Sequence, residues 1–116
     1  MDKEKEARIR DMEMALRGAL SAVRPQAHLD WKSMFGGAGF FVDGRIFAAW
    51  FGQELALKLP PDAAQELTRL SGVSRDEMGK YVELPPGFLD QPEKLNPWVA
   101  RSVDYVLSLP DKKRKR

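Results

Sequence analysis

Few side chains of this sequence have the type and spacing that chemistry requires. His28 is the only histidine, and the only carboxylate near it along the chain is Asp30. The chain has no cysteine, which excludes disulfides, cysteine-ligated zinc or iron–sulfur sites and a thiol nucleophile. A metal site needs three or four convergent ligands, and a nucleophile needs an activating partner. We therefore predict that His28 is a loop histidine with no catalytic or metal-binding role.

Three glycines, Gly36, Gly37 and Gly39, form the second candidate, because glycine-rich loops can hold phosphate groups. Their spacing matches neither the dinucleotide-binding pattern nor the P-loop, and the segment after them is typical of a strand. We interpret them as a tight reversal between two strands. The carboxylates Asp76 and Glu77 lie in a polar stretch where solvation explains them. We expect no enzymatic activity, no catalytic or cofactor-binding residue, no metal site and no cofactor.

The charge of the chain is unevenly distributed. Its 116 residues carry a formal net charge of +2 and a sequence pI near 9.0. Residues 111–116 hold five of the 19 basic residues and one of the 17 acidic residues, so the rest has 14 basic and 16 acidic residues and a net charge of −2. We predict one folded domain over residues 1–110, followed by a basic, disordered tail over residues 111–116.

The tail admits two interpretations. It is a solvated end that aids solubility, or it is an electrostatic arm that binds nucleic acid through phosphate contacts, without sequence specificity. No helix-turn-helix, zinc-finger or aromatic RNA-binding motif accompanies it. The residues of such an arm are Lys112, Lys113, Arg114, Lys115 and Arg116.

No apolar run in the chain approaches the roughly 18–20 residues that span a membrane, and the first six residues are largely charged. A single domain of this length buries about two-thirds of the surface that its unfolded form exposes, so it needs no disulfide or metal to fold. We expect a cytoplasmic protein with no membrane contact.

An amphipathic helix is predicted over residues 3–24, because its apolar residues recur at helical spacing. Pro25 ends the helix, since a proline disfavours the helical conformation of the residue before it. Gly18 weakens it by up to about 1 kcal/mol relative to alanine, unless a close neighbour demands a small residue there. The apolar stripe consists of Ile9, Met12, Leu16, Ala19, Leu20 and Val23.

The period changes between Leu29 and Leu59. Short runs rich in aromatic and aliphatic residues alternate with glycine-containing turns, which predicts a meander of three or four antiparallel strands. Asp43-Gly44 favours a type I′ hairpin turn, because both central positions of that turn need a positive φ. The residues Leu55, Leu57 and Leu59 are predicted to share one face of the last strand. The predicted runs are residues 31–35, 39–42, 45–51 and 54–59.

A short helix is predicted after Pro60-Pro61. Asp62 can cap it, and Gly72 is placed to end it. Leu67 and Leu70 are predicted to face the interior.

The chain then returns to strand and helix. Residues 81–84 are predicted as an added strand. The last helix is predicted from Pro97 to about Leu109, with Asn96 as its N-cap, because a proline inside a helix costs about 3 kcal/mol. The predicted order is helix, strand meander, helix, strand, helix, which is an α+β arrangement.

The aromatic residues of the meander leave two interpretations open. Phe40 and Phe41 are neighbours in a predicted strand, as are Trp50 and Phe51, so the two members of each pair point to opposite faces of the sheet. The aromatic residues on the face without helices are covered by another element or a second subunit, or they form a contact surface for a partner protein. A homodimer through the uncovered sheet face or an edge strand is compatible with both.

Residues 34–48 (MFGGAGFFVDGRIFA) run from a Met-Phe-Gly-Gly stretch into a predicted hairpin with an Asp-Gly turn. This stretch resembles the signature of the N-terminal domain of the TfoX/Sxy competence regulators. The resemblance continues through residues 55–59 (LALKL), residues 81–85 (YVELP) and the closing helix with Trp98, and it covers roughly residues 9–109.

This resemblance implies a two-layer α+β fold of the secretion-chaperone-like type, with helices on one face of an antiparallel sheet of about five strands. It also implies a non-enzymatic regulatory domain that acts through protein contacts, since the family is implicated in transcriptional activation of competence genes together with the cyclic-AMP receptor protein. Two alternatives remain beside it: a nucleic-acid-binding accessory protein that uses the basic tail, and an unrecognised small-ligand binder.

Overall fold

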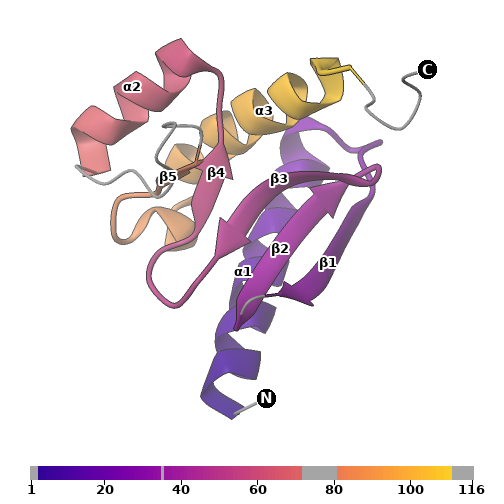
Figure 1. The fold of residues 1–116 in the computed structure, drawn as a ribbon, viewed down its shortest axis with the longest axis vertical. Coiled ribbons are helices and arrows are strands. Elements are labelled where there is room, and N and C mark those ends of the chain that lie inside the picture. Colours follow the sequence, from indigo (N-terminus) through magenta and orange to yellow (C-terminus); the bar gives the residue numbers. More distant parts are fainter. Residues whose placement is uncertain (1–2, 35, 72–80, 111–116) are drawn as a thin grey trace.

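The computed structural model describes residues 3–34, 36–71 and 81–110, whose arrangement is shown in Figure 1. The predicted order of helix, strand meander, helix, strand and helix is confirmed. The elements of this part of the chain are α1 (Lys3–Val23), β1 (Leu29–Met34), β2 (Gly37–Val42), β3 (Arg45–Trp50), β4 (Ala56–Lys58), α2 (Pro61–Ser71), β5 (Tyr81–Glu83), the 3-10 helix η1 (Phe88–Asp90) and α3 (Pro92–Ser108).

The strands form one antiparallel sheet in the order β1-β2-β3-β4-β5. The hairpin between β2 and β3 turns at Asp43 and Gly44, whose φ angles are 51° and 83°. Both angles are positive, as a type I′ turn requires, so this predicted turn is confirmed. Helix α1 packs against α3 and β2, and α3 packs against β3 and β4, which gives a helical layer on a sheet.

The observed strands differ from the predicted runs at their ends. β1 begins at Leu29, two residues earlier than predicted, and β2 begins at Gly37, which belongs to the strand and not to the turn. Both strands are longer because β1 and β2 pair along their whole length, from Leu29 opposite Val42 to Met34 opposite Gly37. Phe35, the predicted end of the first run, lies outside the described residues, as do Asp76 and Glu77.

The apolar stripe of α1 is confirmed from Ile9 to Leu20, whereas Val23, its last predicted member, is half-buried. Its buried residues are 3% exposed or less, and the helix ends at Val23, two residues before Pro25. A Cβ atom built on Gly18 would meet nothing within 4 Å, so no neighbour demands a glycine there. The buried residues are Ile9, Met12, Leu16, Ala19 and Leu20.

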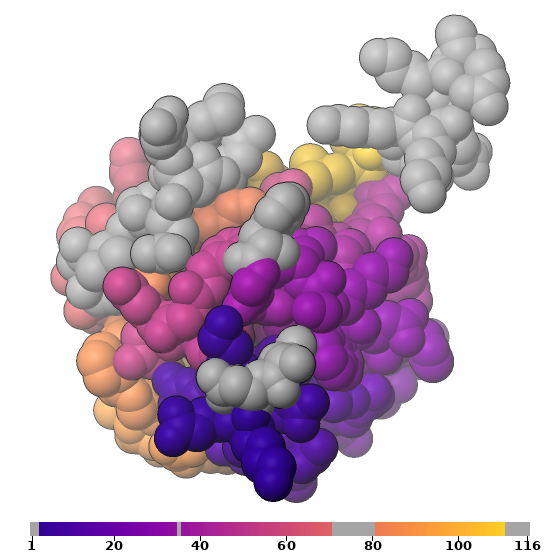
Figure 2. Space-filling model, turned by 60° about the horizontal axis from the view of Figure 1, so that its bottom comes forward, coloured from indigo at the N-terminus to yellow at the C-terminus, as the bar shows by residue number. Residues whose placement is uncertain are grey.

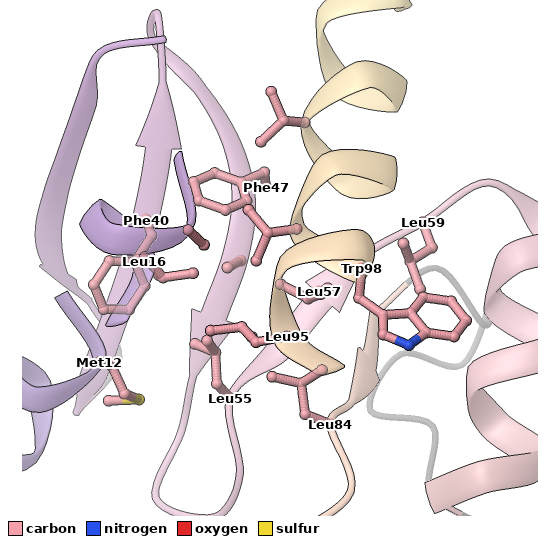
Figure 3. Close-up of a cluster of buried hydrophobic side chains, with 14 of the residues drawn as sticks. Met12, Leu16, Phe40, Phe47, Leu55, Leu57, Leu59, Leu84, Leu95 and Trp98 are labelled. Carbon is pink, nitrogen blue, oxygen red and sulfur yellow. The ribbon is translucent and has the colours of Figure 1, made fainter. Parts of the chain in front are cut away.

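The hydrophobic core lies between the sheet and the helices, as Figure 3 shows for part of it. Leu55, Leu57 and Leu59 all contribute to it, with exposures of 2%, 0% and 0%, so the prediction that these leucines share a buried face is confirmed. Leu95 and Trp98 of α3 belong to the same cluster. The alternating leucines therefore anchor β4 against the helical layer.

A β-bulge in β3 adds an aromatic side chain to this core. Phe40 lies opposite Ala48 and Phe41 lies opposite Ile46, so Phe47 is the extra residue of the β2–β3 pair. Both Phe47 and Ala48 are 0% exposed. The irregular register thus allows two successive residues of β3, Phe47 and Ala48, to join the hydrophobic core.

Ser102 connects α3 to the sheet and is fully buried. Its hydroxyl oxygen lies 3.0 Å from the carbonyl oxygen of Phe47 and 2.7 Å from that of Lys58. Phe47 precedes Ala48 on β3 and Lys58 follows Leu57 on β4, so both lie just beyond the Ala48–Leu57 pair at the end of that ladder. With one hydrogen to donate, the hydroxyl satisfies either buried carbonyl group in turn.

The prediction for the start of the last helix is wrong. α3 begins at Pro92, with Gln91 at the N-cap, so Pro97 lies inside the helix and Asn96 is not its N-cap. Pro92 occupies the first turn, where the missing N–H has no helical partner to lose. The proline at the start of this helix is therefore Pro92 and not Pro97.

Tertiary packing explains why α3 continues through Pro97. The proline removes one hydrogen bond to the carbonyl of Glu93, because proline has no N–H. On either side of it, Leu95 and Trp98 are 2% and 8% exposed. Burial of two such side chains stabilises the fold by about 3–6 kcal/mol, which offsets the cost of one interior proline.

The prediction that Leu70 faces the interior is also wrong, whereas Leu67 is buried as predicted. Leu70 is 59% exposed, because the buried stripe of α2 consists of Ala63, Ala64 and Leu67 and does not reach the last turn. Asp62 lies in the first turn and accepts a hydrogen bond of 2.8 Å from the backbone N–H of Ala63. Gly72, the predicted end of this helix, lies outside the described residues.

Candidate functional site

The four aromatic residues predicted to contact a partner divide into two buried and two accessible side chains. Phe40 is 0% and Trp50 is 5% exposed, so both belong to the core and contribute nothing to the surface. Trp50 also donates a hydrogen bond of 2.8 Å from Nε1 to the carbonyl of Gln53. Phe41 is half-buried and Phe51 is 41% exposed, so these two remain as candidate contacts.

Phe41 and Phe51 are not neighbours. Phe41 lies near the β2–β3 turn, whereas Phe51 follows the far end of β3. Alternation along β2 places Phe41 on the sheet face opposite the buried Phe40, which we call the outer face. The ammonium of Lys32 lies 5.4 Å from the Phe41 ring centroid, in cation–π geometry. The outer face is therefore partly apolar, but it carries charged residues as well.

Gly39 marks the middle of the outer face between these aromatics. A Cβ atom built there would lie 3.0 Å from the Met34 side chain and 3.1 Å from that of Ile46. The side chains of Met34 and Ile46 therefore lie close to the glycine. Both are half-buried, so part of their apolar surface remains exposed. The glycine cluster thus has a packing role here, in addition to the turn at Gly36, where φ is 80°.

A pocket of about 410 Å³ opens where α1, the β2–β3 turn and the end of α3 meet. Leu107, 40% exposed, gives it an apolar wall. Asp43 of the turn contributes a carboxylate. The full lining is Val23, Arg24, Pro25, Gln26, Ala27, Asp43 and Leu107.

The ends of α1 and α3 lie together beside this pocket, and neither helix has a basic residue in its last turn. Two arginines from outside these turns supply the positive charge that a helix C-terminus favours. Arg24 donates to the carbonyl of Val23 and to both carboxylate oxygens of Asp104. Arg45, on β3, donates to the carbonyl of Val106 at 2.7 Å and to that of Leu109. Both arginines therefore bond acceptors within the domain.

The ion pair between Arg24 and Asp104 perturbs both partners. The hydrogen bond to Asp104 and its negative charge raise the pKa of Arg24. The hydrogen bond from Arg24 and its positive charge lower the pKa of Asp104, and partial desolvation opposes this shift. Both side chains are about half exposed, at 41% and 55%, so the pair is a surface ion pair that links the residue after α1 to α3.

His28 has the surroundings of an exposed loop residue. Its Nε2 atom lies 3.9 Å from Asp30, and the two side chains are 77% and 66% exposed. Among the described residues there is no group of three or more histidine, aspartate or glutamate side chains that could hold a metal ion. No helix in the described ranges is long and apolar enough to cross a membrane. The five basic residues 112–116 lie outside these ranges.

A comparison with protein families matches residues 21–106 to the TfoX N-terminal domain. The chain belongs to this family. The match extends from the end of α1 to the last turn of α3, so the five strands and all of the pocket-lining residues except Leu107 lie within the matched range. A search of curated proteins finds no significant match.

Sequence reasoning missed the charged contacts of this TfoX N-terminal domain and one exposed aromatic residue. Arg24 and Asp104 are 80 residues apart, and no local pattern connects them. Trp31, 37% exposed, lies on the edge strand β1. The sequence did carry a signal for Trp31, since it stands between Asp30 and Lys32 in a strand that begins the meander.

Proposed function

We propose that this TfoX N-terminal domain is a non-enzymatic regulatory module that works through contacts with another protein, in transcriptional regulation. The observation that carries the proposal is the family match over residues 21–106. Regulation by contact needs an accessible surface and no catalytic group, and such a module would display apolar or aromatic side chains on a rigid sheet.

The proposed contact residue is Phe51, with Phe41 as a second contact at the other end of the same strand pair. Phe51 is 41% exposed directly after β3, a large aromatic side chain of the kind that anchors protein interfaces. The sheet beneath both residues is held in place by the core, so a partner would meet a preformed surface.

Affinity capture from cells tests this proposal. Tagged wild-type chain is cross-linked in its native host, and the captured proteins are identified by mass spectrometry. We expect a transcriptional regulator to be captured by the wild type and lost with Phe51→Ser. Leu70→Ser is the matched control, because Leu70 is an exposed apolar residue on α2 and should not change the capture. If the wild type captures nothing that Phe51→Ser loses, the contact proposal is wrong.

A second candidate function is nucleic-acid binding by the tail, which five cations within six residues favour. Such an arm would bind duplexes of any sequence, and raising the salt concentration would weaken the binding steeply. Duplex titration of the full chain and of a chain without residues 112–116 tests this idea. Equal affinity of the two chains would exclude it.

A further inference from the structure

β1 is an unusually complete edge strand. It forms one edge of the sheet and pairs with β2 over all six residues without a register shift, whereas β5 at the other edge has three residues. β1 contains no proline and no bulge, two of the devices that protect an edge from pairing with another strand, and its charged residues are one acid and one base, Asp30 and Lys32. Figure 1 shows β1 at the margin of the sheet, and Figure 2 shows the purple strand region as one flank of the space-filling surface.

The backbone groups of β1 that face away from β2 can be assigned. The N–H of Asp43 donates to the carbonyl of His28 at 3.2 Å, so His28 points its backbone groups towards β2. In an antiparallel ladder this direction alternates along the strand. Leu29, Trp31 and Ser33 therefore present their N–H and C=O groups to the open edge, where a further strand can bond to them.

The side chains of β1 select one register for such a strand. A second copy of β1, antiparallel and centred on Trp31, sets Asp30 opposite Lys32 of the other copy, twice by symmetry. A centre on Lys32 would oppose two lysines, and a centre on Asp30 would oppose two aspartates, which is unfavourable. The centre on Trp31 also makes Trp31 a hydrogen-bonded pair with its copy, in agreement with the outward direction of its backbone groups.

The side chains in the middle of β1 are exposed, as expected for a free edge in the monomer. Asp30, Trp31, Lys32 and Ser33 are all exposed, and Trp31 is 37% exposed although it lies opposite the fully buried Phe40. Because cross-strand partners share a face, Trp31 lies on the helix-covered face, and Asp30 and Lys32 lie on the outer face. Pairing would thus bury two indole rings against each other on one face and form two ion pairs on the other.

We propose that two copies of this chain associate through β1, antiparallel and centred on Trp31, to form one continuous sheet across the dimer. Trp31 of each copy exchanges backbone hydrogen bonds with Trp31 of the other, and Leu29 does so with Ser33. The two Asp30–Lys32 pairs fix the register, because every neighbouring alignment that keeps the hydrogen bonds loses them. This self-association is independent of the proposed regulatory function, since it needs only the purified chain.

A charge-swap experiment tests both the edge and the register. Sedimentation of the wild-type chain over a range of concentrations should show a monomer–dimer equilibrium. Asp30→Lys and Lys32→Asp, each alone, should weaken it at least about tenfold, since each variant opposes like charges at the interface. A one-to-one mixture of the two variants should restore association, because the mixed dimer again sets opposite charges against each other.

Several outcomes would overturn the proposal. A wild type that remains monomeric up to about 1 mM, at the weak end of measured affinities, excludes self-pairing. Dimers that are indifferent to both single variants place the interface elsewhere. Single variants that weaken the dimer and a mixture that does not restore it exclude this register.

Ser33→Pro serves as a second test, because it removes an N–H that faces away from β2 and so spares the β1–β2 ladder. We expect unchanged circular dichroism and thermal unfolding for a monomeric Ser33→Pro, with association lost. Association equal to that of the wild type would contradict pairing through β1.

Discussion

The guanidinium of Arg45 donates a hydrogen bond of 2.7 Å to the carbonyl oxygen of Val106, 61 residues later in the chain. Arg45 is the first residue of β3, directly after the Asp43-Gly44 turn, and it also bonds the carbonyl of Leu109. One cation from the sheet thus bonds two carbonyl groups at the end of α3, of which that of Val106 also accepts a bond of 3.3 Å from the backbone N–H of Leu109. The hairpin turn thus places Arg45 where it links the sheet to the end of the last helix.

Arg45→Met should lower the free energy of unfolding by about 1–3 kcal/mol, because it removes the charge-assisted hydrogen bonds to the carbonyls of Val106 and Leu109. Urea denaturation monitored by circular dichroism measures this change. Arg10→Met is the control, since Arg10 is an exposed residue of α1. Equal losses in the two variants would mean that the contact with Val106 contributes nothing specific.

Ser102→Ala should destabilise the domain by about 1–3 kcal/mol. The hydroxyl reaches two carbonyl oxygens at the end of the β3–β4 ladder, and its removal leaves a buried acceptor without a donor. The substitution removes only one buried atom, so the transfer contribution is small in comparison. Ser108→Ala, at an exposed serine in the last turn of the same helix, is the matched control in the same denaturation experiment. A Ser102→Ala variant as stable as the wild type would contradict this account.

Gly18→Ala should stabilise the domain by up to about 1 kcal/mol, because alanine has the higher helix propensity and glycine the larger loss of backbone entropy. A Cβ atom at this position meets nothing within 4 Å. The expected result is a higher melting temperature in a thermal unfolding experiment. An unchanged or lower value would show that a contact absent from the structure restricts this position.

Gly37→Ala should have the opposite effect and cost about 3 kcal/mol or more, as overpacking does where the backbone must shift. A Cβ atom at Gly37 would lie 1.9 Å from the carbonyl oxygen of Trp50 and 2.9 Å from its carbonyl carbon. The β2 and β3 backbones cannot both keep their positions around such an atom. Thermal unfolding of Gly37→Ala and Gly18→Ala, measured together, should show a lower melting temperature for the first and a higher one for the second. A Gly37→Ala variant as stable as the wild type would refute the close approach.

Local patterns in the sequence predicted the parts of the fold that neighbouring residues determine. The stripe from Ile9 to Leu20 is a helical period, and Asp43-Gly44 is a turn whose chemistry is contained in two residues. Leu55, Leu57 and Leu59 form a two-residue period, and all three are buried. Each of these predictions needed no information from distant parts of the chain, and each is confirmed.

The predictions that are wrong involve packing between distant segments. Proline chemistry alone starts the last helix at Pro97, but the burial of Leu95 and Trp98 against the sheet keeps Pro97 inside a longer helix. Helical spacing alone buries Leu70, but the last turn of α2 extends beyond the packed stripe. Propensity and periodicity describe one segment at a time, and tertiary contacts override both.

The candidate contact residues were predictable only as a set of four. Alternation correctly separates Phe40 from Phe41 and Trp50 from Phe51, but it does not identify which face the helices cover. The bulge at Phe47 further changes the alternation of β3. The ion pair of Arg24 with Asp104 and the hydrogen bond of Arg45 to Val106 join residues that are far apart in the sequence. No local sequence pattern predicts such contacts.

Asp104→Asn should lower the melting temperature above about pH 5 and have progressively less effect in acid. The ion pair with Arg24 lowers the pKa of Asp104 below its usual value of 3.8, so the folded state holds the carboxylate more strongly than the unfolded chain does. The stabilisation is present above the pKa of the unfolded state and is lost as the pH falls through the lower folded-state pKa.

Melting curves of the wild type and Asp104→Asn between pH 2 and pH 7 measure this dependence. The difference between them should be smaller in high salt, because both side chains are about half exposed and their attraction is screened. Asp11→Asn, at an exposed aspartate of α1, is the control. A difference for Asp104→Asn that stays constant down to pH 2 would show that the carboxylate charge is not what joins the end of α1 to α3.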